Sequence, residues 1–342
     1  MKNFTVKKLA VLILAVLLSS SCGHLHQKEG SALSQSPSQS QSPRQSQSLN
    51  QPLSLRQSRR DAVMSKALQW IADHPASFED GGFLEMGEEA NLFYVLYTKA
   101  KSSEEKKFYR SRMERIIQEL RAQKNFRIEF AGEVTAYLAI TKAAERLGFD
   151  TEDFHRFIRQ DILNNEMTYP SNITYIILNS SLLIDLGYEP RTPLADSIEK
   201  GVIVSMARDS YLIPIGKSYA SETDVTNFFY DITHEIFAIS SFGDKDPERM
   251  LMPKEGEFVH RIIAEGISLY LPKKQLDILC ELVVCSKIME YKDIPGLEET
   301  VDFICESQSK EGDFGVIPRM KDLGRGNFYR HGVLVAVWAL AS

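Results

Sequence analysis

Several signatures that would identify an enzyme class are missing from this sequence of 342 residues. It has no GxGxxG or P-loop motif, and its Gly-x-Ser matches lack the second glycine of a nucleophile elbow. His234-Glu235 does not begin an HExxH motif, because the residue four after the histidine is alanine. The four cysteines show no CxxC or Cys–His spacing, which disfavours a zinc site built on thiolates.

The sequence also lacks an N-terminal apolar run of membrane-spanning length. The run from Leu9 to Leu18 is shorter than the about 20 residues that a spanning helix needs. It follows three lysines and precedes three serines and Cys22, so residues 1–21 are predicted to be a secretory signal. LSSSC, ending at Cys22, resembles the lipobox of bacterial lipoproteins, which implies cleavage before Cys22 and its acylation. A plain secretory signal that ends nearby is the alternative.

The lipobox resemblance implies a place in the cell envelope. Gly23 follows the cysteine where an inner-membrane retention signal has Asp, so a cell with two membranes is expected to sort the protein to its outer membrane. Residues 22–60 are rich in Ser, Gln and Pro, and we predict that they form a disordered tether. Residues 61–342 then form a single domain, joined to the membrane through the lipid anchor at Cys22.

The charge of that domain disfavours nucleic acid as a partner. The formal net charge of the whole chain is −6, the signal contributes +3 and the tether +4, and the remaining residues therefore carry −13. An acidic body repels phosphate backbones at long range. The partner is left as an unknown small molecule, glycan or protein.

Three cysteines lie in the predicted domain, at positions 280, 285 and 305. One disulfide with one free thiol, or three buried thiols, are both possible. Cys280 and Cys285 are five residues apart on one predicted helix and should point in different directions, so each would pair more readily with Cys305.

From residue 61 onward the apolar residues recur at spacings of three and four, which predicts an all-α fold. Apolar helices, often closed by a glycine, alternate with amphipathic ones, which form a loose internal repeat. Thr192-Pro193 is expected to open a helix that continues to about Arg208. Six inner helices (near residues 88, 130, 171, 224, 273 and 327) and six outer ones (near 62, 104, 151, 193, 256 and 295) indicate an α/α toroid, with an irregular α-solenoid as the alternative.

Three segments resemble known families. ESQSKEGDFG (Glu306 to Gly315) and YRHGVLVAVWALA (Tyr329 to Ala341) resemble a linker and a closing inner helix of the terpenoid-cyclase and prenyltransferase toroids. ITHEIFAISSFG (Ile232 to Gly243) resembles an uncharacterised bacterial family with a Thr-His-Glu and Phe-Gly signature. The first resemblance implies an α/α-toroid fold, but the chain lacks the DxDD motif of the cyclases and the Cys and His patterns of the prenyltransferase zinc sites.

In a toroid the inner helices run parallel, so polar residues in their first turns should converge at one mouth. The strongest candidate is His234, which has Asp231 three residues before it and Glu235 directly after it. A carboxylate that holds one ring nitrogen can orient a histidine as a general base or a metal ligand. We expect His234 to lie near the first, second and last inner helices, and the predicted catalytic set is His234, Asp231, Glu235, His331 and Glu133, with zinc as a possible cofactor.

Two functional classes remain open at this point. One is a module that binds a ligand or partner at the mouth, in which these side chains form a hydrogen-bonded polar core. The other is an enzyme acting on a glycan or an isoprenoid-like substrate through a His–carboxylate site. The sequence alone does not decide whether the protein is an enzyme.

Overall fold

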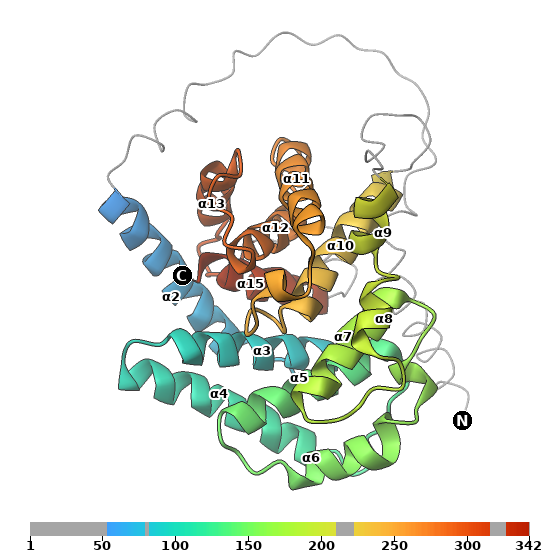
Figure 1. Ribbon diagram of the computed structural model, residues 1–342. Helices are drawn as coiled ribbons and strands as arrows, with labels where there is room; N and C mark the ends of the chain where they lie inside the picture. The colour runs from blue at the N-terminus through green and yellow to red at the C-terminus, as the bar shows by residue number, and fades with distance from the viewer. Residues whose placement is uncertain (1–52, 79–81, 210–221, 315–325, 342) are drawn as a thin grey trace, which may run out of the picture.

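The computed structural model describes residues 53–78, 82–209, 222–314 and 326–341, and within these ranges the chain is helical without strands. This confirms the predicted all-α class. In Figure 1, α3 to α6 lie on one side of the molecule and α11 to α13 on the other, with α7 to α10 between them. The signal, Cys22 and most of the predicted tether lie outside the described residues.

Six apolar helices contact one another in a closed cycle. Each packs against the next in the chain, and the last packs back on the first, in the order α3, α5, α7, α10, α12, α15. The toroid interpretation requires such a cycle. The bounds of these inner helices are Phe83–Lys99, Ala131–Arg146, Ile173–Asp185, Glu222–Ile239, Leu276–Ile288 and Gly326–Leu340.

The intervening helices cover this ring from outside. α2 packs on α15, α4 on α3 and α5, α11 on α12, and α13 on α12. Their more polar sequences leave one apolar face for that contact. The bounds are Leu53–Asp73 for α2, Ser103–Ala122 for α4, Glu152–Phe157 for α6, Leu194–Ile198 for α8, Val202–Asp209 for α9, Pro253–Tyr270 for α11 and Leu297–Glu306 for α13.

Two boundaries differ from the sequence-based expectation. The helix expected from Thr192 to Arg208 is broken into α8 and α9, because a buried carboxylate binds the first amides of α9 (described below). Residues 53–60, which the sequence assigned to the tether, are helical in the structure. Helix α2 begins at Leu53, and Arg56 and Arg60 pair with Glu298 of α13.

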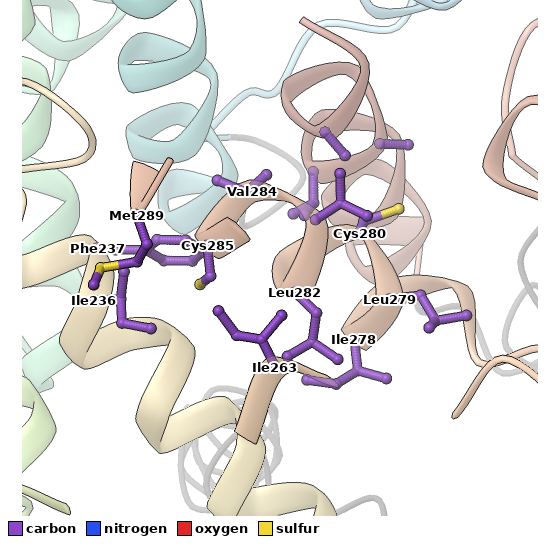
Figure 2. Close-up of a cluster of buried hydrophobic side chains, with 14 of the residues drawn as sticks. Ile236, Phe237, Ile263, Ile278, Leu279, Cys280, Leu282, Val284, Cys285 and Met289 are labelled. Carbon is purple, nitrogen blue, oxygen red and sulfur yellow. The ribbon is translucent and has the colours of Figure 1, made fainter. Parts of the chain in front are cut away.

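The apolar faces of both layers form two large buried clusters that share Tyr97, Phe242 and Trp338 at their boundary. Figure 2 shows part of the larger one, where Cys280 and Cys285 lie on different sides of α12. All three described cysteines are buried and free, so of the two possibilities the structure has three separate thiols. Within the described ranges, none of the helices has the length and hydropathy that crossing a bilayer requires.

A buried ion network joins α5, α7 and α10 where these helices end. Lys142 is 2% exposed, and its Nζ lies 3.3 Å from Asp185 and 2.7 Å from Asp244. The same ammonium donates to the carbonyl of Ser241 at 2.9 Å and to its hydroxyl at 2.6 Å. Ser241 and Phe242 both have positive φ, which costs conformational energy in residues other than glycine, so Lys142 stabilises a strained turn.

We expect Lys142→Met to lower the free energy of unfolding by about 3–5 kcal/mol, because Asp185 would then be buried without this partner. Urea denaturation measures the change. Lys245→Met is the matched control: Lys245 also pairs with Asp185, but its side chain is 43% exposed, so its loss should cost less than about 1 kcal/mol. Equal effects of the two variants would contradict the assignment.

Candidate functional site

Charged and hydroxyl side chains from five of the six inner helices meet inside the ring. In four of these five helices the contributing side chains lie in the first two turns, as expected if the helix N-termini lie together; α10 contributes from further along its length. We call the six titratable members the central cluster: Glu88 from α3, Asp231 and His234 from α10, Asp277 and Glu281 from α12, and His331 from α15.

His331 makes the most contacts within the cluster. Its Nδ1 donates to Glu88 at 2.9 Å. Its Nε2 lies 3.3 Å from Asp277 Oδ1 and 3.8 Å from Glu281 Oε1. Burial lowers the pKa of His331, but the surrounding carboxylates of Glu88, Asp277 and Glu281 outweigh this effect and raise the pKa well above 6.5.

Each of the two carboxylates of α12 has one oxygen fixed by a hydrogen bond from α10. Tyr230 donates to Asp277 Oδ2 at 2.7 Å, and Thr233 donates to Glu281 Oε2. Asp277 Oδ1 is buried, and although His331 lies near it, no hydrogen bond reaches it from the described residues. Glu281 is 1% exposed, and its Oε1 lies 3.8 Å from the Nε2 atoms of both His234 and His331. Each carboxylate therefore presents one oxygen toward His331.

His234 lies at the more exposed side of the cluster, with 40% of its side chain accessible. The sequence predicted that Asp231 or Glu235 would orient it. Instead, Asp231 accepts a hydrogen bond from Thr174 of α7 at 3.1 Å. Burial raises the pKa of Asp231, while this hydrogen bond and His234 lower it. The histidine that a carboxylate does orient is His331.

Glu235 faces the outer layer of helices and does not join the central cluster. Its two oxygens accept hydrogen bonds from the backbone N–H groups of Val202 at 2.6 Å and Ile203 at 2.9 Å, at the start of α9. A Cβ at Gly201 would lie 2.8 Å from the carboxylate, so glycine at this position leaves room for it. Burial raises the pKa of Glu235 to about 7. The structure therefore does not bring Glu235 together with the other predicted residues, because its carboxylate caps the start of α9.

Glu133 is also outside the cluster. It accepts a hydrogen bond from the backbone N–H of Glu129 at 2.6 Å, at the entry to α5. Burial raises its pKa. The second inner helix, α5, thus contributes no member to the cluster. The sequence predicted that His234 would lie near the first and second inner helices, but its carboxylate neighbour Glu281 belongs to the fifth, α12.

The set of residues predicted from the sequence did not include Glu88, and its neighbour Glu89 has other partners. Glu89 is fully buried and pairs with Arg112 at 3.3 Å and Arg115 at 3.0 Å on the outer helix α4. Adjacent helical residues point about 100° apart, so only one of the two glutamates can face inward. The arginines of α4, spaced three apart, were the signal that Glu89 had an outer partner.

Glu85 lies one turn before Glu88 and is nearly buried. Burial and the charge of Glu88 raise its pKa to about 7, although His331 and Arg330 lower it. A fifth acidic group therefore borders the cluster, close to half protonated at neutral pH.

The fold and the site define a class: an all-helical domain that holds a His–carboxylate cluster inside a ring of helices. A family model described as a domain of unknown function, DUF6895, matches residues 59–323, and the chain belongs to this family. The match contains every member of the central cluster except His331. No curated protein and no solved structure matches the chain.

We expect Glu235→Ala to lower the free energy of unfolding by about 2–3 kcal/mol, because two amide groups at the start of α9 would lose their acceptors. Glu105→Ala is the matched control, since Glu105 also accepts two backbone N–H bonds, but at the exposed start of α4, where water can replace it. Urea denaturation compares the two. Unchanged stability in Glu235→Ala would contradict the capping role.

Proposed function

We propose that this protein is a lipid-anchored protein of the cell envelope whose helical domain binds a positively charged small ligand at the central cluster. The observation that supports the proposal is the excess of carboxylates over cationic groups in this cluster. Four carboxylates, at positions 88, 231, 277 and 281, face two histidines, of which His331 alone bridges several of them. Carboxylates grouped in this way repel one another, most strongly around the buried Glu281, and a bound cation reduces that cost.

The partial exposure of the cluster supports binding of a ligand. The side chains of His234 and Glu88 are 40% and 41% exposed, whereas Glu281 below them is buried. Solvent therefore reaches the cluster from one side, and the buried side is shaped by hydrogen bonds to Tyr230 and Thr233. A ligand can enter and meet a preformed set of acceptors.

The envelope location rests on the N-terminal sequence. The signal, the lipobox-like LSSSC and the Ser/Gln/Pro-rich segment precede α2 in the order expected of an anchored protein.

A second candidate function is an enzyme, for which the toroid resemblance suggests a glycan or isoprenoid-like substrate. The observation that favours it is the hydrogen bond from His331 Nδ1 to Glu88. A histidine held in this way presents its other nitrogen in a fixed direction, as a general base or acid requires. Under this alternative, His331 replaces His234 as the central residue.

Cation binding is tested by thermal shift and calorimetry with choline and polyamines, with EDTA present to remove metals. We expect Asp231→Asn to weaken binding about tenfold, because it removes one charge while keeping an acceptor for Thr174. Asp161→Asn removes an exposed charge on the outer layer and should change nothing. Binding of anions or neutral sugars in preference to cations would refute the proposal.

The anchor is tested separately. We expect metabolic labelling with an alkyne fatty acid to mark the wild-type protein and not Cys22→Ser, and the variant to leave the membrane fraction. The buried cysteines at 280, 285 and 305 remain in both proteins and serve as an internal control for non-specific labelling. Equal labelling of both proteins would contradict acylation at Cys22.

A further inference from the structure

We propose that Asp277, Glu281 and His331 bind a divalent transition-metal ion, for which zinc is the best fit. This inference rests on the proposed function, because it names the cation that the central cluster takes. The three side chains each offer one ligand atom, and these atoms lie within 4.8 Å of one another. They come from two helices that pack side by side, α12 and α15.

The spacing of the three atoms suits a small ion. Zinc–nitrogen and zinc–oxygen bonds of about 2.0–2.1 Å in a tetrahedron place the ligand atoms about 3.3 Å apart. His331 Nε2 is 3.3 Å from Asp277 Oδ1 and 3.8 Å from Glu281 Oε1. The two carboxylate oxygens lie within 4.8 Å of each other, so a bound ion would complete the geometry by drawing the side chains of Asp277 and Glu281 together.

Outer partners distinguish this site from a chance group of acidic side chains. Each of the three residues uses one polar atom toward the common point and has its other polar atom held by a neighbour. Glu88 holds His331 Nδ1, Tyr230 holds Asp277 Oδ2, and Thr233 holds Glu281 Oε2. Metal-binding histidines and carboxylates are oriented in this way by a second layer of hydrogen bonds.

One of the atoms that face the common point lacks a hydrogen-bond partner in the described part of the chain. Asp277 Oδ1 is buried without one. Glu281 is 1% exposed, and the two histidine nitrogens near its Oε1 lie beyond hydrogen-bond distance. Buried polar atoms are rarely left in this state, because it costs about 1–3 kcal/mol. A metal ion would satisfy Asp277 Oδ1 and give Glu281 Oε1 a closer partner than the histidine nitrogens at 3.8 Å.

The ligand types select the ion. One imidazole with two carboxylates suits zinc and its first-row neighbours, whereas calcium and magnesium prefer oxygen ligands alone. His234 Nε2 lies 3.8 Å from Glu281 Oε1 and can supply a fourth ligand or leave that position to water. Because 40% of the His234 side chain is exposed, the fourth position would lie on a side of the cluster that solvent reaches, as in zinc sites that act on a substrate.

The test uses the full chain, purified in detergent, treated with EDTA and dialysed. We expect it to bind one zinc ion per chain by elemental analysis, and cobalt to give the visible absorption bands of a four- or five-coordinate site. Asp277→Asn, Glu281→Gln and His331→Asn should each abolish the cobalt bands. Glu88→Gln should weaken zinc binding about 10- to 100-fold, as loss of a second-layer partner does.

Two controls separate a site from adventitious binding and from misfolding. His260→Asn removes a surface His–carboxylate pair, in which Nε2 lies 3.1 Å from Asp293, and should leave zinc affinity unchanged. Circular dichroism melting of each variant without metal shows whether it folds. Zinc binding that survives in folded His331→Asn, or that is lost in His260→Asn, would overturn the assignment.

The outcome also separates this inference from the proposed function. If the chain binds no zinc or cobalt, but binds organic cations in EDTA in a manner that Asp231→Asn weakens, the metal site is refuted and cation binding stands. If neither kind of cation binds, both proposals fail. If zinc binds and organic cations in EDTA do not, the metal is the cation that the cluster takes.

Discussion

The closed order of the six inner helices is the constraint on which the rest of the structure depends. A helix inside the ring has a neighbour on either side and an outer helix behind it, so nearly all of its surface must be apolar or paired. Its polar side chains have two acceptable places: the ends of the helix, or contacts with other polar groups. The central cluster lies mainly at the N-terminal ends of inner helices, and the Lys142 network lies at C-terminal ends.

The two polar groups differ in how completely they are satisfied. In the Lys142 network the ammonium meets Asp185, Asp244 and Ser241, so its charge and its donors are used within the protein. In the central cluster the carboxylates outnumber the cationic groups, and one buried oxygen of Asp277 has no hydrogen bond from the described residues. The first arrangement stabilises a turn, and the second leaves acceptors available to a ligand.

The sequence predicted the all-α class, the alternation of apolar and amphipathic helices, and the presence of Asp231, His234 and His331 near one another. Periodicity carries this information because burial of one helix face needs a regular spacing. It could not decide which of two adjacent glutamates faces inward, since Glu88 and Glu89 differ by one residue and both have partners from other helices. Nor could it show that Glu235 binds the amides at the start of α9, because that contact joins residues 33 positions apart.

Three consecutive residues of α10 face three different parts of the structure. Thr233 binds the buried carboxylate of Glu281, His234 faces the solvent side of the cluster, and Glu235 holds the outer helix α9. A mutational scan that reads only loss of activity would place all three in one site. Loss of activity in a Glu235 variant would result from displacement of the outer helix α9. Folding and binding assays on the same variants would distinguish this effect from a direct effect on the central cluster.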